Sequence, residues 1–159
     1  MTDATGKILP VLEFRRVSPE LCDALGEFFV RLKRAGDDRH FHPHQFTSEQ
    51  ARLIAHYTGQ DLYYVLVADA QVLGYGMLRG WDEGYEVPSL GIALAPAWRD
   101  MGIGSVFMAM LHMAARVRGV KRVRLKVHKD NGRAIELYTR LGYQFVSEEA
   151  GQQVGYFEL

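Results

Sequence analysis

The residues best suited to chemistry are Arg99, Gly102 and Gly104, which stand in the spacing Arg-x-x-Gly-x-Gly between a predicted strand and a predicted long helix. A chain that turns sharply into a helix presents the unpaired N–H groups of the first helical turn, and the helix dipole adds partial positive charge there. Glycines leave no Cβ between this backbone and a ligand, and Arg99 can add a charge-assisted contact. The segment is therefore a candidate site for an anion such as a diphosphate.

Two better-known phosphate-binding patterns do not fit this segment. The dinucleotide fingerprint needs a third glycine and an acidic residue further on, and the P-loop needs Gly-Lys-Ser/Thr. Glycines ahead of a helix also serve as plain turn residues, so the hexapeptide alone leaves that interpretation open.

A second group with chemical potential is the phenol of Tyr138, seven residues after Asn131. Seven residues make about two helical turns, so the two side chains fall on one helix face. A phenol with an ordinary pKa near 10 can protonate a leaving thiolate, because the pKa of a free thiol is about 8.5. The alternative is structural, with Asn131 as a helix cap and Tyr138 as a core residue.

An alternation of strands and helices must position these groups. Period-two patterns predict strands at 11–17, 62–68, 72–78, 87–94, 123–127, 143–147 and 154–159. Apolar residues at helical spacing predict helices at 18–36, 47–59, from Gly104 to about 119, and at 131–141. Gly74 and Gly76, inside a strand, indicate a bulge or a close backbone approach. The order predicts a mixed α+β sheet with helices on its faces.

Together, residues 92–105 and 131–143 resemble the motifs of the GNAT acetyltransferase superfamily. They read Ile-Ala-Leu-Ala-Pro-Ala-Trp-Arg-Asp-Met-Gly-Ile-Gly-Ser and Asn-Gly-Arg-Ala-Ile-Glu-Leu-Tyr-Thr-Arg-Leu-Gly-Tyr. The order of predicted elements also fits. The resemblance implies a single GNAT domain over residues 1–159, with a mixed, mostly antiparallel sheet of about seven strands and four helices on both faces.

The resemblance also implies an N-acetyltransferase with acetyl-CoA as cosubstrate, in which a primary amine of a small acceptor attacks the thioester directly. The strand backbone at 92–94 would pair with the pantetheine arm, and an N–H near Leu94 would polarise the thioester carbonyl. The glycine turn would hold the diphosphate, Asn131 would contact the pantetheine or a neighbouring chain, and Tyr138 would protonate the departing thiolate. The implied cofactor-binding residues are Ile92, Ala93, Leu94, Arg99, Asp100, Met101, Gly102, Ile103, Gly104, Ser105 and Asn131.

The attacking amine must be neutral, so the reaction needs a general base. Enzymes of this superfamily often carry a carboxylate on the strand just before position 92, but here Pro88, Ser89 and Leu90 stand there. We predict Glu86 as the catalytic carboxylate, acting through water with Ser89 as a relay, and Glu83 could act in the same way. Both glutamates also suit an ordinary charged loop.

Three histidines, His40, His42 and His44, alternate in the loop at 37–46, so an extended chain would place them on one side. No carboxylate or cysteine completes a metal site among them, and no metal is predicted. Because an imidazole titrates near neutrality, His42 is a second candidate base and His44 a candidate acceptor-binding residue. A polar loop without a chemical role is the alternative.

Trp81, Glu83 and Tyr85 form a further candidate acceptor-binding segment. Aromatic faces beside carboxylates suit sugars and amines. The expected acceptor is an amino sugar or a sugar nucleotide, with a protein N-terminus or a polyamine as alternatives, and Trp81 also suits a core anchor. A non-catalytic acyl-CoA-binding regulatory domain, an O-acyltransferase and a preference for longer acyl chains remain open.

Composition narrows the class of partner and the compartment. Lys plus Arg and Asp plus Glu both number 19, so the formal net charge is zero, which argues against a nucleic-acid partner. No apolar run approaches the roughly 18 residues of a membrane helix, so no membrane partner is expected. The single cysteine excludes an internal disulfide and the first residues show no signal-peptide pattern, which together favour the cytoplasm. Whether a homodimer forms stays open.

Overall fold

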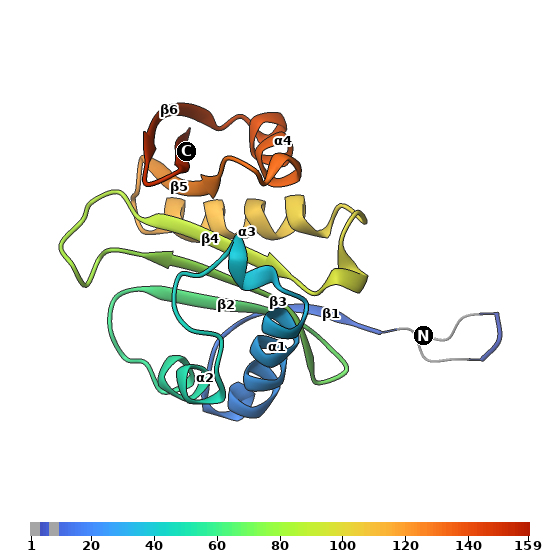
Figure 1. Cartoon of the computed structure of the whole chain (residues 1–159). Helices are drawn as coiled ribbons and strands as arrows, with labels where there is room; N and C mark the ends of the chain where they lie inside the picture. The colour runs from blue at the N-terminus through green and yellow to red at the C-terminus, as the bar shows by residue number, and fades with distance from the viewer. Residues whose placement is uncertain (1–3, 7–9) are drawn as a thin grey trace.

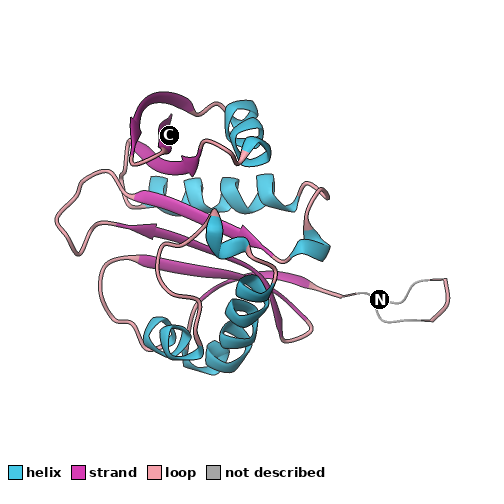
Figure 2. Ribbon diagram, in the orientation of Figure 1, coloured by secondary structure: helices cyan, strands magenta, loops and turns pink. Residues whose placement is uncertain are grey.

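One sheet of seven strands organises the computed structural model, which describes residues 4–6 and 10–159 (Figures 1 and 2). The strand order is β1-β2-β3-β4-β5-β7-β6, and every neighbouring pair is antiparallel except β4 and β5. The strands are β1 (Leu12–Arg16), β2 (Leu62–Ala68), β3 (Gln71–Arg79), β4 (Ser89–Leu94), β5 (Arg122–His128), β6 (Gln144–Glu149) and β7 (Gln152–Glu158). The predicted fold class and strand count are confirmed.

Four α-helices among these described residues cover the two faces of the sheet (Figure 1). On one face lie α1 (Cys22–Arg34) and α2 (Ser48–Ala55), and on the other α3 (Ile103–Val117) and α4 (Gly132–Leu141). Short 3-10 turns occur at η1 (Pro19–Leu21), η2 (Asp37–Arg39) and η3 (Pro96–Trp98). Within the described ranges, no helix has the length and apolar character needed to cross a bilayer.

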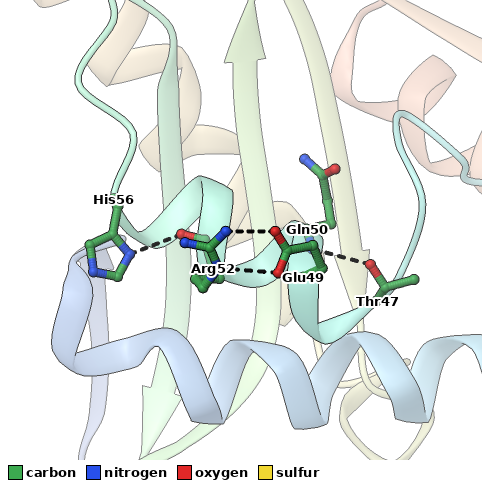
Figure 3. Close-up of polar contacts among 5 residues, drawn as sticks. All are labelled: Thr47, Glu49, Gln50, Arg52 and His56. Atoms are coloured by element: carbon green, nitrogen blue, oxygen red, sulfur yellow. Dashed lines mark hydrogen bonds and ion pairs between the residues drawn. The ribbon is translucent and has the colours of Figure 1, made fainter.

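The first two helices begin in different ways. Thr47 Oγ1 accepts a hydrogen bond from the Gln50 N–H at 3.1 Å, and Glu49 pairs with Arg52 one turn further on (Figure 3). This helix ends at Ala55, earlier than the predicted Gly59. At the observed end, the His56 ring forms a hydrogen bond with Arg52 O. Ser18, by contrast, makes no capping hydrogen bond, because the 3-10 turn η1 precedes α1.

The glycines in β3 allow α3 to pack closely against the sheet. A Cβ at Gly76 would lie 2.9 Å from both Leu111 Cδ1 and Phe107 Cζ, which is too close for a real contact. Gly74 lies under Leu94 and Phe107 in the same way. The predicted close approach is thus confirmed, and it fixes the height of α3 above the strand that precedes the glycine turn.

A buried histidine joins α3 to the last strands. His112 Nε2 lies 2.7 Å from the Tyr143 hydroxyl, and its ring stacks on Phe157 with centroids 4.3 Å apart. Burial, with a smaller contribution from the positive charge of Arg116, lowers the pKa of His112 from its ordinary value to about 4. The imidazole is therefore neutral in the folded protein at neutral pH.

Acidification is expected to destabilise the fold through His112. Between about pH 6.5 and pH 4 the unfolded chain binds a proton on this imidazole and the folded chain does not, so the free energy of unfolding falls by about 3 kcal/mol as the pH drops through that window. Urea unfolding at about pH 7 and pH 4.5 measures the loss. His112→Gln can keep a hydrogen bond to Tyr143 without titrating, so it should lose less, and equal losses would contradict the assignment.

Candidate functional site

The two central strands β4 and β5 separate soon after they begin. In the part of the chain that the structure describes, Ser89 and Arg124 are their one paired position, while β4 stays paired with β3 up to Leu94. Backbone directions alternate along such a strand, and the Ala95 N–H donates to Leu73 O at 2.8 Å on the β3 side. The N–H groups of Ile92 and Leu94 therefore face the gap, where an extended ligand can add as a strand would.

The glycine turn that leads into α3 has the geometry of an anion site. Asp100 and Gly102 adopt left-handed backbone conformations, with φ of 60° and 78°. Gly102 is the N-cap of α3, no side chain caps this end, and the first turn holds no acidic residue. The first-turn N–H groups are thus left without helical acceptors and without a competing carboxylate.

Arg99 ties this turn to the open strand edge. Its Nε and Nη2 donate to Leu94 O at 3.1 and 2.8 Å, and Nη2 lies 2.8 Å from Asp37 Oδ2. We expected the charge of Arg99 to contact the diphosphate. In the structure, Leu94 O and Asp37 hold the guanidinium, which ties the turn to the end of β4, and a contact with the diphosphate stays a prediction.

A pocket of about 550 Å³, named the wedge pocket, runs along the gap and the start of α3. The predicted cofactor-binding residues that line it are Ile92, Ala93, Leu94, Arg99, Asp100, Gly102, Gly104, Ser105 and Asn131. Met101 and Ile103 do not line it with their side chains: Met101 is 63% exposed, and Ile103 packs against the core. These two residues can contribute backbone N–H groups alone.

Two arginines of α4 that were not predicted also line the wedge pocket. Arg133 pairs with Asp100 at 2.6 Å, which offsets the negative charge at the turn, and Arg140 lies further along the same helix. Asn131 accepts a hydrogen bond from the Ala134 N–H at 3.3 Å, so it caps α4 while lining the pocket.

Tyr138 lies where the wedge pocket meets a second pocket. The second one, named the sheet pocket, has a volume of about 800 Å³ and opens over the sheet face that α1 and α2 leave uncovered. Burial raises the pKa of Tyr138 to about 12. The residues that line both pockets are His40, Phe41, Ile92, Lys126 and Tyr138.

The floor of the sheet pocket is a row of side chains across four strands. Cross-strand pairing aligns Arg79 with Ser89, Ser89 with Arg124, and Arg124 with Tyr156. Directly paired residues point to the same face of a sheet, and all four line the pocket. The row places one arginine on each side of the Ser89 hydroxyl.

The rim carries most of the predicted acceptor-side residues. Glu83, Tyr85, Glu86 and His42 line the sheet pocket, and Tyr85 is 61% exposed. The loop that carries Glu83 is anchored at its start by Asp61, a buried carboxylate that accepts hydrogen bonds from the N–H groups of Gly80 and Trp81 at 2.9 and 3.0 Å. The structure therefore brings these candidates together around one cavity.

Two predicted acceptor-binding residues lie elsewhere. Both ring nitrogens of His44 are engaged, Nε2 with the Tyr75 hydroxyl at 3.0 Å and Nδ1 with Gln45 O at 2.9 Å, and burial lowers its pKa. Trp81 packs in the core under the Arg118 guanidinium, 4.6 Å from its ring. Neither residue lines the wedge pocket or the sheet pocket, so the structure does not bring them together with the other acceptor-side candidates.

The loop histidines meet a third one from β5. The ring of His128 lies 5.2 Å from that of His42 and 6.0 Å from that of His40, and His40 pairs with Asp130 at 3.3 Å. Among residues 4–6 and 10–159, no three side chains of the metal-ligating kinds converge as a site.

Sequence reasoning noted the basic residues of β5 but did not place them, with Arg79, as a cationic wall of the sheet pocket. Arg124 and Lys126 alternate with buried Val123, Leu125 and Val127 along β5, so the period-two pattern already placed them on the opposite face. The pattern does not reveal that this face is left without a covering helix. For Arg79, the sequence gives no indication of a place in the pocket, because its neighbours across the sheet depend on strand pairing.

The comparisons with known proteins agree with this architecture. The sequence profile of the acetyltransferase (GNAT) family matches residues 22–143, and no curated protein matches the sequence. The GNAT domain of S. lividans PAT superposes with a TM-score of 0.80 at 15% identity, over 95% of this chain and 96% of that one. PaiA N-acetyltransferase from Thermoplasma acidophilum, solved with coenzyme A, has a TM-score of 0.76 at 16% identity, over 94% and 99%. A GCN5-related N-acetyltransferase from Kribbella flavida has a TM-score of 0.76 at 23% identity, over 93% and 98%.

The family profile and the shared fold together define the class of this protein. The chain belongs to the acetyltransferase (GNAT) family. Acetyl-CoA is the cosubstrate of that family, and the wedge pocket fits it. The open edge at Ile92 and Leu94 suits the amides of a pantetheine arm, and the first turn of α3 suits a diphosphate.

The turn gives a test with a matched control at the other end of α3. Gly102 and Gly119 share a φ of 78°, and a Cβ at either would meet no atom within 4 Å. Alanine at either site should cost about 1–2 kcal/mol of stability for the left-handed backbone. Gly102→Ala should also weaken acetyl-CoA binding at least ten-fold by calorimetry, and Gly119→Ala should not. Equal affinities would remove the diphosphate from this turn.

Proposed function

We propose that the protein transfers the acetyl group of acetyl-CoA to a primary amine of a small acceptor bound in the sheet pocket. The observation that carries this proposal is the position of Tyr138, which lines both pockets. A donor in the wedge pocket and an acceptor in the sheet pocket would meet at this phenol. We place the activity in the cytoplasm, in one domain over residues 1–159.

Acetyl-CoA supplies the acetyl thioester. The Leu94 N–H, which the strand pairing directs into the gap, is the donor that we assign to the thioester oxygen. A backbone donor fixed by a paired strand needs no reorganisation as charge develops on that oxygen. Direct attack by the amine then requires no covalent enzyme intermediate.

Tyr138 is the proton donor that we assign to the sulfur. With its pKa raised to about 12, the phenol stays protonated at neutral pH. The same buried surroundings disfavour a thiolate and raise the pKa of a thiol placed there, so the two acidities move in the same direction. The transfer therefore stays feasible in spite of the raised pKa.

The base that we assign is Glu86, which lines the sheet pocket and acts through water. His42 is the alternative. Its Nδ1 donates to Asp38 O at 3.1 Å, because a carbonyl only accepts, and this leaves Nε2 of the neutral ring as a proton acceptor. Glu83 and Tyr85 are assigned to the acceptor itself, which we propose to be an amino sugar or a sugar nucleotide.

Removing the phenol tests the acid role. Tyr138→Phe should lower kcat at least ten-fold and leave the affinity for acetyl-CoA within two-fold, because the hydroxyl acts on the departing sulfur. Thiol release and calorimetry measure the two quantities. Tyr143→Phe is the matched control: it loses the hydrogen bond to His112 and should lower Tm without a comparable fall in kcat. An unchanged kcat in Tyr138→Phe would refute the acid role.

The two rim glutamates should separate kinetically. Glu86→Gln should lower kcat at least ten-fold, because an amide cannot take the proton of the amine, whereas Glu83→Gln should mainly raise KM for the acceptor. Steady-state kinetics at saturating acetyl-CoA distinguish the two. If His42→Gln lowers kcat and Glu86→Gln does not, the base is the histidine.

A further inference from the structure

The row Arg79, Ser89 and Arg124 on the floor of the sheet pocket is not explained by binding of an amine. Neighbouring strands lie about 4.8 Å apart, so the two arginine backbones are separated by about 10 Å with the serine midway. Long guanidinium side chains span that interval easily. An acceptor that is only cationic would be repelled from this surface.

The polar atoms of both arginines are incompletely used. Arg79 Nη1 donates to Pro43 O at 3.0 Å, and Arg124 Nη2 lies 2.8 Å from Glu149 Oε1. The Nε atoms of both are buried and, among the described residues, have no hydrogen-bond partner. Buried donors of this kind are normally satisfied, so hydrogen bonds within the described residues leave both guanidinium groups incompletely paired.

The charge balance differs between the two arginines. Glu149 pairs with Arg124 and also with Lys126, at 2.8 and 2.6 Å. In the described part of the chain, Arg79 pairs with no carboxylate, since its one recorded hydrogen bond goes to a neutral carbonyl. The pocket therefore contains a guanidinium whose charge is left for a bound anion.

We propose, on the basis of the proposed function, that the acceptor carries an anionic oxygen group, a carboxylate or a phosphate, which binds between Arg79 and Arg124 over Ser89. Guanidinium forks bind both groups through paired N–H donors. Glu83 and Glu86 line the same pocket, so an acceptor that carries both an amine and an anionic group meets side chains of opposite charge there. Among the acceptors considered above, a sugar nucleotide or a protein N-terminus with a nearby carboxylate fits this arrangement. A polyamine, or an amino sugar without an anionic group, does not.

This anion site is separate from the one for the cosubstrate. The wedge pocket has its own cations, Arg133 and Arg140, and its own uncapped helix start, and neither Arg79 nor Arg124 lines it. Substitution at Arg79 therefore tests the acceptor without touching the residues assigned to the diphosphate.

Matched pairs of acceptors test the proposal by thiol release at saturating acetyl-CoA. Lysine against cadaverine differs by a carboxylate, and glucosamine 6-phosphate against glucosamine differs by a phosphate. We expect kcat/KM at least ten-fold higher for the member of one pair that carries the anionic group, and the pair that responds identifies the anion. In Arg79→Gln this ratio should fall close to one, while the affinity for acetyl-CoA stays within two-fold.

The control variant is Arg122→Gln. Arg122 lies on the same face of β5 as Arg124, with its guanidinium carbon 4.6 Å from the centre of the Tyr156 ring, but it does not line the pocket. It should keep the ratio. Two results would overturn the proposal: turnover without preference for the member that carries the anionic group, or a kcat/KM ratio that Arg79→Gln leaves unchanged.

If no amine is turned over, the proposed function fails and the anion site is tested on its own. Calorimetric titration with glucosamine 6-phosphate and with lysine then decides. Binding that is weakened at least ten-fold in Arg79→Gln supports the site, and absent or unaltered binding overturns it.

Discussion

The separation of β4 from β5 is the constraint on which the rest of the site depends. A parallel pair that held its register past Ser89 and Arg124 would use the backbone groups of Ile92 and Leu94 in its own ladder. Because the strands part, these groups face a pocket instead, and the gap between the strands is where the two cavities meet at Tyr138. One missing stretch of hydrogen bonds thus supplies both the strand-like edge and the place where the wedge pocket and the sheet pocket meet.

Packing on both faces keeps that gap open. On one face, Gly74 and Gly76 let α3 settle against β3, so the helix start stands at a fixed distance beyond the end of β4. On the other, Phe41 packs against Gly91, where a Cβ would lie 2.8 Å from its ring. The Arg99 guanidinium joins the two sides, since it holds Leu94 O and Asp37 at once. The anion-binding turn is therefore positioned by contacts from three separate segments.

Charge is distributed over the site in a way that net charge conceals. The chain has a formal net charge of zero, yet β5 presents cations along one face while the loop after β3 presents glutamates. Opposite charges at two walls of one cavity orient a ligand as well as attract it. The acidic rim and the basic floor thus give the sheet pocket two walls of opposite charge.

The sequence by itself determined the elements and the cosubstrate side, because those signals are local. The alternation of β5, the start of the helix predicted from residue 47 and the glycine turn before α3 each depend on a few adjacent residues, and all appear where they were predicted. Tertiary structure decided the acceptor side. It turned His44 inward against Tyr75 and Trp81 under Arg118, and it placed Arg79 beside Ser89 and Arg124 through strand pairing. A side chain's neighbours across a sheet depend on register and on which face a helix leaves bare, and neither is encoded in the spacing of adjacent residues.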